Sequence, residues 1–376
     1  MPRFAYFRRL TQCDAPLYGT VDRYHLLHLC KKCDSVARKS KRELIGEGDL
    51  PVTVIDVARV AGVSPITVSR ALHRPERVSE ATRERVLEVV RAMGYVPNLL
   101  AGSLASSKSR LVAILLPTIA NSIFSTAVQA MMDRLTEAGY QALLGPTGYS
   151  PEKEEALLEA ILGRRPDGIV LTGTLHTSGS RARLASAGIP VVEAWDLSDN
   201  ALDMQVGFSH EEVGRLVADH FHDKGYRRFS VITVDDPRGI RRCNALTDRL
   251  KTFGVDEIAL EVLPLPATWE VGREGLKRLM KLPSRPQLVF CSSDTVALGV
   301  LAEAANLGLR VPQDIAVLGF GDTTNSRFAH PALSTIGVNS AAMGKAVAEA
   351  LLRRFSGSTS PVHQDTSFIL IERSST

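Results

Sequence analysis

The feature that most limits the fold is a regular alternation of short apolar runs with helical stretches from Leu111 onward. The run LVAILLP at residues 111–117 is continuously apolar, which is typical of a strand buried on both faces of a parallel sheet. A helical stretch at 121–138 follows it, and the same order repeats through GIVLTG, RFSVITV, LVFCSS and IAVLGFG. Such alternation predicts parallel sheets with helices on both faces.

The alternation forms two successive arrays of similar size. This predicts an α/β body at residues 111–376, with two doubly wound lobes and a cleft between them. The chain end, with STIGVN, a helix at 341–355 and SFILIERSS, is long enough to cross back between the lobes. The motifs G-x-x-x-x-G-K-[ST], H-E-x-x-H and G-x-S-x-G are missing, and GFGDTT has Thr324 where a dinucleotide motif needs glycine. These absences argue against an enzyme.

Residues 52–96 have a different, all-helical pattern. Three helices are predicted, at 54–61, 65–72 and 80–93, and a glycine follows the first and the third. The third helix has apolar residues at spacings of three and four, which predicts one buried stripe. The stripe consists of Val86, Val89, Val90 and Met93.

The first two of these helices have the residues of a helix-turn-helix. Ala58 and Ala61 are small enough to let the second helix pack closely, and Gly62 makes the turn. Val63, Val68 and Leu72 are spaced to hold the second helix on the core, which leaves polar residues facing outward. The predicted DNA-contacting residues are Thr53, Ser64, Pro65, Ile66, Thr67, Ser69, Arg70 and His73. The alternative is a helical hairpin that packs against another domain.

Three members of this set have distinct predicted roles. Arg70 is the main polar candidate for a base or phosphate contact. Pro65 fits the first turn of the second helix, where its missing N–H is not needed. Ile66 cannot hydrogen-bond a base edge, but it can contact a thymine methyl group. The N-terminal tip of this helix is therefore predicted to sense shape, with Thr53, Ser64, Thr67 and Ser69 near the phosphate backbone.

The charge distribution is compatible with a polyanionic partner that contacts the N-terminal part of the chain. Residues 1–50 carry ten Lys and Arg against six Asp and Glu, and residues 51–110 carry nine against five. The remaining residues carry 26 against 30, so the body is mildly acidic. A basic N-terminal part and an acidic body favour contact with nucleic acid through the N-terminal part. A basic surface that is only solvated would give the same net charges.

Residues 1–51 form a basic leader without periodicity. His25, His28, Cys30 and Cys33 fall within nine residues, whereas a structural zinc site needs ligand pairs spaced across a small fold, so no metal is predicted. An odd number of cysteines and no apolar export signal indicate free thiols in the cytoplasm. The leader is either a flexible basic segment or, by a second hypothesis, a product of a translation start placed too early.

The stretch TVIDVARVAGVSPITVSRALHRPERVSEATRERVLEVVRAMGYVPNLLAGSLAS resembles the headpiece of the LacI/GalR family of bacterial repressors. The shared motifs are D-V-A-x-x-A-G-V-S-x-x-T-V-S-R, V-S-x-x-T-R-x-R-V and G-Y-x-P-N. The resemblance continues through the body, which is similar to periplasmic sugar-binding proteins. It implies a transcriptional repressor, without a cofactor, in which a sugar in the cleft controls operator binding.

The resemblance also implies a hinge at residues 97–110, of which Pro97–Ala105 folds into a helix on operator DNA. Leu104 occupies the place of the family's minor-groove leucine, which kinks DNA by wedging between base steps. Asn98 belongs to the same predicted DNA-binding set. Gly102 stands where the family usually has arginine, and glycine weakens an isolated helix by about 1 kcal/mol relative to alanine. Ordering of this hinge is therefore expected to depend more on DNA.

In the body, the resemblance places candidate effector-binding residues at strand ends that face the cleft. They are Asn121, Phe124, His176, Trp195, Asp196, Arg238, Arg242, Trp269, Asp294, Phe320 and Asp322. The motifs GYSPEKEEALL, RRPDGIVLTGTLHT, VVEAWDL and DMQVGFS are similar to the gluconate-utilisation repressors of this family. An arginine pair suits the carboxylate of a sugar acid. Neutral-sugar repressors, however, also keep an arginine at the place of Arg242, and His176 and the aromatic residues are equally compatible with packing roles.

No leucine heptads follow the last strand, so a homodimer through the body is favoured over a tetramer. Such a dimer would bind a palindromic operator through two half-sites. The rivals to this prediction are a cytoplasmic sugar-binding protein and a sugar-modifying enzyme, both without a DNA role. The sequence leaves open the identity of the effector, the operator sequence and whether the effector induces or co-represses.

Overall fold

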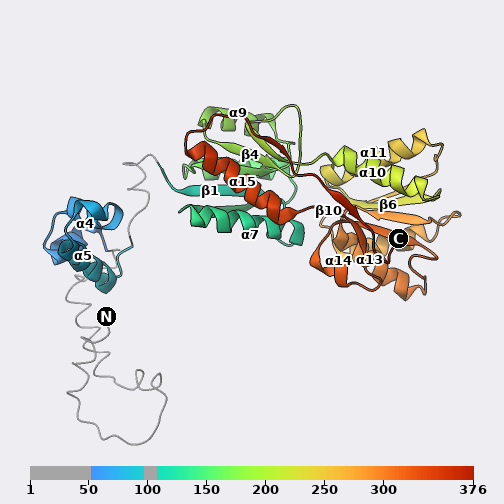
Figure 1. The fold of residues 1–376 in the computed structure, drawn as a ribbon, viewed down its shortest axis with the longest axis horizontal. Helices are drawn as coiled ribbons and strands as arrows, with labels where there is room; N and C mark the ends of the chain where they lie inside the picture. The colour runs from blue at the N-terminus through green and yellow to red at the C-terminus, as the bar shows by residue number, and fades with distance from the viewer. Residues whose placement is uncertain (1–51, 97–107) are drawn as a thin grey trace, which may run out of the picture. The chain divides into compact units, whose positions relative to one another are not determined.

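The structure is a computed structural model that describes residues 52–96 and 108–376 (Figure 1). The chain divides into two compact units, a helical headpiece in the part up to Ala101 and an α/β body from Gly102 onward. The leader, with its four His and Cys candidates, and the hinge residues Asn98 and Leu104 lie outside the described residues. Within the described ranges, no helix combines the length and the apolar character needed to cross a membrane.

The headpiece consists of three α-helices, α3 (Val54–Ala61), α4 (Pro65–His73) and α5 (Glu80–Met93), with bounds close to those predicted. A short 3-10 helix at Pro75–Arg77 was not predicted. Each α-helix begins at a side-chain cap: Thr53, Ser64 and Ser79 accept a bond from the backbone of the third helical residue. These caps satisfy N–H groups that the helices themselves leave without partners.

A small apolar core holds the three helices together. Ala58 and Ala61 on α3 are each only 3% exposed, so small side chains do permit the close approach of α4. Val68 and Ala71 bury one face of α4, and Val86 and Met93 bury the predicted stripe of α5. The opposite face of α4 is left in solvent.

The first lobe of the body, lobe 1, has a sheet of six parallel strands in the order β11-β5-β4-β3-β1-β2. Its strands are β1 (Leu111–Leu116), β2 (Gln141–Pro146), β3 (Gly168–Thr172), β4 (Val191–Ala194), β5 (Met204–Gly207) and β11 (His363–Asp365). Its helices are α7 (Ser122–Glu137), α8 (Pro151–Leu162), α9 (Ser178–Ala187) and α15 (Ser340–Phe355). Helix α15 packs against α7 and lies beside it in Figure 1, so the end of the chain completes the first lobe.

The second lobe, lobe 2, has a sheet in the order β12-β10-β9-β8-β6-β7, in which only the edge strand β12 runs antiparallel. Its strands are β6 (Phe229–Val234), β7 (Ala259–Leu263), β8 (Leu288–Cys291), β9 (Ala316–Gly321), β10 (Ser334–Gly337) and β12 (Ile369–Ile371). Its helices are α10 (His210–Asp223), α11 (Pro237–Thr252), α12 (Trp269–Leu279), α13 (Asp294–Asn306) and α14 (Thr324–Phe328).

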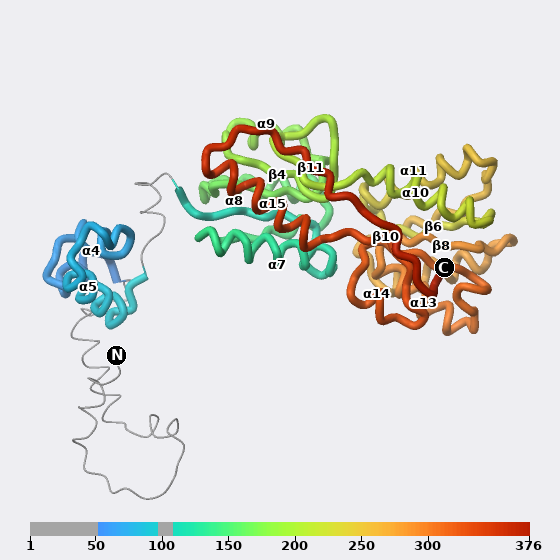
Figure 2. The backbone as a smooth tube through the Cα atoms, viewed as in Figure 1, coloured from blue at the N-terminus to red at the C-terminus, as the bar shows by residue number. Residues whose placement is uncertain are grey.

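The chain crosses between the lobes three times, and the tube in Figure 2 shows the last crossing leading from β11 towards β10 and the C-terminus. The crossings follow β5, β10 and β11. The inner strands of both sheets are buried on both faces as predicted, whereas the edge strands β2, β7, β11 and β12 are partly or fully exposed. In β1, Val112, Ile114 and Leu116 face one apolar cluster, while Ala113 and Leu115 face another. This alternation has the two-residue period of a strand.

Several element bounds differ from the predictions. Helix α7 covers Ser122–Glu137 and α15 begins at Ser340, whereas the sequence predicted a helix at 121–138 and a start at 341. In α11 the proline occupies the first turn, where it is tolerated, so the helix takes in Arg238. The polar edge strand β11 and the short helix α14 were not predicted as elements, because three exposed polar residues and a five-residue turn show no periodicity.

Candidate functional site

In the headpiece, one face of α4 has the properties of a contact surface. Its exposed residues are Ser64, Pro65, Ile66, Ser69, Arg70 and His73, and Thr67 is half-buried. Ile66 is 63% exposed, although it is a large apolar residue. Burial on the folded headpiece therefore does not account for Ile66, and its position leaves it available to a partner.

Two of the predicted phosphate-binding hydroxyl groups already act as helix caps. The Ser64 Oγ accepts the backbone N–H of Thr67 at 3.1 Å. The Thr53 hydroxyl donates to the Asp56 Oδ2 at 2.7 Å, in a reciprocal capping box. These two side chains thus orient the N-termini of α3 and α4, whose positive dipole ends favour phosphate.

In the body, side chains from both lobes enclose a cavity, here called the cleft cavity. Seven of the predicted effector residues line it: Asn121, Phe124, Trp195, Arg238, Arg242, Asp294 and Phe320. They come from the carboxyl ends of β1, β4, β6, β8 and β9, or from the helices that follow them. Parallel sheets bind ligands at these ends, because the connecting loops gather there.

The lobe 1 wall of the cavity is aromatic. Phe124 and Trp195 meet edge to face, with ring centres 5.2 Å apart. Trp195 has a φ of 67°, a left-handed conformation that a bulky residue rarely adopts and that the surrounding structure must hold in place. The Arg238 guanidinium, from lobe 2, lies 5.4 Å from the centre of the Phe124 ring and 5.9 Å from that of Tyr149.

Arg242 is held in the cavity by two hydrogen bonds and a ring contact. Its Nη2 donates to the carbonyl oxygen of Ser292 at 2.8 Å, and its Nη1 lies 2.9 Å from the Nδ1 of His210. The guanidinium also stacks over Phe320, with its central carbon 3.9 Å from the ring centre. Burial lowers the pKa of Arg242 to about 10, so the group remains charged at neutral pH.

Four nitrogen atoms in the cavity wall are buried without a hydrogen-bond partner: the Trp195 Nε1, the His210 Nε2, the Arg238 Nη1 and the Arg242 Nε. Arg238 has an acidic partner, the Asp236 carboxylate at 3.2 Å. Arg242, by contrast, has no carboxylate partner among the residues that the structure describes. A buried, charged donor set of this kind suits a ligand that brings acceptor oxygens and negative charge.

Asp294 borders the cavity, but its carboxylate is occupied. It accepts bonds from the Ser326 hydroxyl at 2.6 Å, the Thr335 hydroxyl at 2.6 Å and the Thr323 backbone N–H at 2.7 Å. These bonds connect α13 to the segments that follow β9 and to β10. Burial raises the pKa of Asp294, and the three donors oppose that rise. In this structure its contacts are those of a residue that holds the cavity wall together.

Asp196 lies beside the cleft cavity and joins the two lobes. Its Oδ2 accepts from the Arg241 Nη1 of lobe 2 at 2.6 Å and from the Thr174 hydroxyl at 2.9 Å. Arg241 also binds both carboxylate oxygens of Glu211, at 2.6 and 2.9 Å. Gly207 is required next to this pair, because a Cβ there would lie 2.4 Å from the backbone nitrogen of Asp196.

The structure places three predicted effector residues away from the cleft cavity. The His176 ring lies between Glu154 and Glu193 inside lobe 1, with its Nδ1 2.6 Å from Glu154. Trp269 is the first residue of α12 and is 49% exposed, and the neighbouring Ala267 lines the cavity instead. Asp322 forms an ion pair with Arg373 at 2.6 Å. For these three residues, the position in the chain did not determine whether the side chain points into the cleft cavity.

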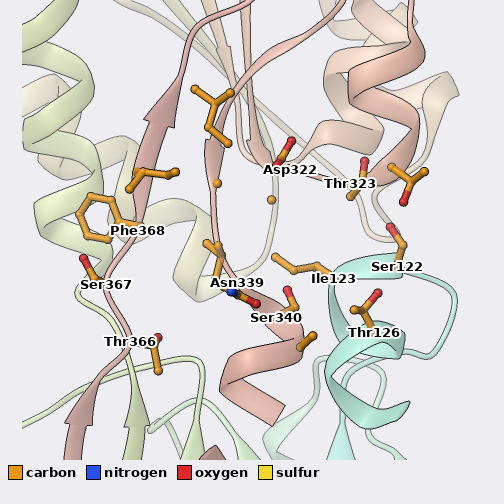
Figure 3. Close-up of a pocket in the computed structure, with 17 residues that line it drawn as sticks. Ser122, Ile123, Thr126, Asp322, Thr323, Asn339, Ser340, Thr366, Ser367 and Phe368 are labelled. Atoms are coloured by element: carbon orange, nitrogen blue, oxygen red, sulfur yellow. The ribbon is translucent and has the colours of Figure 1, made fainter. Parts of the chain in front are cut away.

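Asp322 lines a second pocket at the lobe crossings, here called the hinge pocket (Figure 3). Ser122, Asn339, Ser340 and Thr366 surround it, and Phe368 closes one side. The hinge pocket and the cleft cavity share Ile123 and Thr323, so the two spaces are neighbours.

The prediction missed ten residues that line the cleft cavity, among them the polar residues Tyr149, His210, Asp236 and Ser292. Each of these four follows the carboxyl end of a strand, so the rule that places ligands at these ends could have found them. Burial and the negative charge of the nearby Asp236 raise the pKa of Tyr149 to about 12, which keeps its phenol protonated. Tyr149 is therefore a further neutral hydroxyl group in the cavity wall.

The buried position of His176 gives a stability prediction. Burial alone would lower its pKa, but bonds to Glu154 and Glu193 raise the pKa to about 9. Because this exceeds the unfolded value of about 6.5, the stabilisation is complete below pH 6.5 and is lost as pH rises through 9. The unfolding free energy should therefore fall by about 3 kcal/mol from pH 7 to 10. Chemical denaturation of His176→Gln should show a flatter profile, and equal slopes for the two proteins would contradict the assignment.

Comparison with known proteins agrees with this arrangement. Residues 53–98 match the family of bacterial regulatory proteins of the lacI type, and residues 218–376 match a periplasmic binding protein-like domain. An HTH-type transcriptional regulator, GntR of Pseudomonas aeruginosa, is 38% identical over 81% of this chain and 90% of its own length.

Solved structures give the same result. A LacI-family regulator from Silicibacter pomeroyi matches with a TM-score of 0.81 and 31% identity, over 86% of this chain and 99% of its own. The lac repressor dimer bound to operator and an anti-inducer matches with a TM-score of 0.74 and 25% identity, over 87% and 99%. The chain therefore belongs to the LacI family of bacterial regulatory proteins, and it is a DNA-binding transcriptional regulator rather than an enzyme.

Proposed function

We propose that this regulator is a repressor whose operator affinity is controlled by a gluconate-like sugar acid bound in the cleft cavity. The observation that carries the proposal is Arg242, a buried guanidinium without a carboxylate partner. A buried charge is stable only when it is paired or well hydrogen-bonded, and Arg242 keeps its Nε–H unpaired. An effector carboxylate would supply both the negative charge and the acceptor oxygens.

The rest of the cavity suits the hydroxylated part of such a molecule. The Trp195 Nε1–H and the Arg238 Nη1–H are unpartnered donors. Asn121 uses its Oδ1 to cap α7, which leaves its amide N–H₂ for a ligand. The rings of Phe124 and Trp195 offer apolar faces to the C–H groups of a sugar. These groups support a polyhydroxylated ligand at the same place as the carboxylate.

A neutral sugar is the second candidate. Arginine also binds hydroxyl groups, and the aromatic wall suits any sugar. No described carboxylate lies within ion-pair distance of Arg242, although Asp236 and Asp196 act on it from farther away; this favours the sugar acid, because a neutral ligand would leave the guanidinium without a direct anionic partner.

Thermal unfolding in the presence of matched ligands tests the proposal. Gluconate at about 100 times its dissociation constant should stabilise the folded protein by about 2.7 kcal/mol, which corresponds to roughly 5 to 10 °C. Sorbitol and glucose, which have similar hydroxyl groups but no carboxylate, should give little or no shift at the same concentration. Stabilisation by a neutral sugar, with no effect of any sugar acid, would overturn the proposal.

The DNA-binding part of the proposal rests on the exposed face of α4 and on the family. We place Arg70, Ile66 and the outward residues around them in the major groove, and Asn98 and Leu104 in the hinge contact with the minor groove. A homodimer would present two such faces to a palindromic operator. Exposed apolar residues on the edge strands, Leu144 of β2 and Leu260 and Val262 of β7, support association through the body. The site of action is the bacterial cytoplasm, where the operator lies.

A further inference from the structure

His210 lies at the point where the chain enters lobe 2. It is the first residue of α10, directly after the first crossing, and Ser209 caps that helix. The imidazole is 2% exposed and lines the cleft cavity. It packs edge-on against Phe208, with ring centres 4.9 Å apart. These contacts allow the ring little freedom to turn.

The contact with Arg242 determines which nitrogen of His210 carries the proton. The Nδ1 lies 2.9 Å from the Arg242 Nη1. A guanidinium has only donors, so the Nδ1 must accept, and the proton of the neutral ring is on the Nε2. A doubly protonated ring would place two N–H groups against each other.

The surroundings keep the ring neutral. Burial lowers the pKa of His210 well below its ordinary value, and the charges of Arg242, Arg238 and Arg241 on α11 lower it further. The backbone of Trp195, at the end of β4, acts in the opposite direction and raises the pKa of His210. The three arginines of α11 thus surround the imidazole, which stays neutral and remains a hydrogen-bond acceptor across the physiological pH range.

His210 also determines where the unpaired N–H of Arg242 points. The two Nη atoms are held by His210 and by the carbonyl oxygen of Ser292, and Phe320 covers one face of the guanidinium. Of the three guanidinium nitrogens, only the Nε is left without a hydrogen-bond partner. Without the acceptor at His210, rotation about the side-chain bonds would let Arg242 leave this orientation.

We propose that His210 is a positioning residue of the effector site, a neutral acceptor that holds the Arg242 guanidinium in the orientation that receives the effector carboxylate. This inference rests on the proposed function. It assigns to His210 an effect on affinity and on selectivity for anionic ligands that acts through Arg242.

Gluconate binding to three variants, measured by calorimetry on the full chain, tests the proposal. His210→Asn keeps an acceptor bonded to Cγ, so its affinity should remain within about fivefold of the native protein. His210→Phe fills a similar volume without an acceptor and should bind about 30-fold more weakly, as expected for loss of a hydrogen bond to a charged group. His222→Phe, on the same helix but stacked on Phe253, is the matched control and should bind normally.

A pH profile separates positioning from direct charge pairing. With a neutral His210, the affinity of the native protein for gluconate should be nearly constant from pH 8 to 6. A steep gain in affinity towards pH 6 that disappears in His210→Asn would mean that the protonated ring binds the carboxylate itself, and would overturn the proposal.

The remaining outcomes are also decisive. Native affinity in His210→Phe would overturn the role of His210 while leaving the sugar-acid proposal intact. Failure of the native protein to bind any sugar acid would instead overturn the proposed function. If His210→Phe loses its cooperative unfolding, His210→Gln, whose polar atoms lie one bond farther from the backbone, takes its place as the disabling variant.

Discussion

Arg242→Leu should weaken gluconate binding by roughly 30-fold or more and should abolish the response of operator binding to the effector. The substitution removes the cavity's one buried guanidinium that lacks a carboxylate partner among the described residues. Loss of one partner of a buried, hydrogen-bonded charge pair raises the binding free energy by about 2 to 5 kcal/mol, which is roughly 30-fold to several thousand-fold in affinity. Calorimetry with gluconate and operator titration with and without it would measure both effects.

The control for this variant is Arg249→Leu on the same helix. Arg249 pairs with Asp219 and covers Phe253 outside the cleft cavity, so its replacement should leave gluconate affinity unchanged. Operator binding in the absence of effector should persist in both variants, because the headpiece is a separate compact unit. Normal induction or co-repression in Arg242→Leu would show that the effector does not use this guanidinium.

Arg70→Ala should nearly abolish operator binding. The residue is exposed on α4, and its side chain makes no ion pair or hydrogen bond within the described headpiece, so it is available to DNA. A bidentate contact to a base is worth about 1 to 3 kcal/mol, and a dimer loses it in both half-sites, which gives a decrease of roughly 30-fold to 10⁴-fold. Fluorescence anisotropy with a labelled operator at fixed salt would measure the loss.

Ile66→Ala should behave differently from Arg70→Ala. Its side chain can contact only a methyl group, so the variant should relax the preference at one base pair and retain most of the overall affinity. The control for charge is Arg91→Ala on α5, where Arg91 bonds to the carbonyl oxygen of Leu87 within its own helix. Uniform losses across all operator variants for Ile66→Ala would mean that this residue serves packing only.

The elements that could be predicted are those in which one clear pattern of apolar residues runs along the sequence. The apolar runs of β1 and β8, the largely apolar β6 and the stripe of α5 each follow from burial alone, and their bounds agree closely with the structure. The 3-10 helix, α14 and β11 were not predictable in this way. Each is at most five residues long and owes its position to tertiary contacts, as in the pairing of β11 with β5 at the edge of lobe 1.

The sequence located the strand ends that form the candidate site. It did not show which side chains at these ends point into the cavity. Phe124, Trp195, Arg238 and Arg242 come from distant parts of the chain and line one cavity, as the topology requires. His176 also follows a strand, but two buried carboxylates hold it inside lobe 1. His210 follows a strand end and could have been placed at the site, but its role had no recognisable signal, because its neutral tautomer depends on an arginine 32 positions away in the sequence.

The ion pair between Arg241 and Asp196 has a consequence for how such a regulator can be tuned. Neighbouring residues on a helix point about 100° apart, so Arg241 reaches Asp196 of lobe 1 while Arg242 faces the cleft cavity. A substitution at Arg241 would change the free energy between open and closed lobes without changing the groups that meet the ligand. Under the proposed function, the dose at which the protein responds and the molecule to which it responds would be set by adjacent but separable positions, and either one could change in evolution while the other is kept.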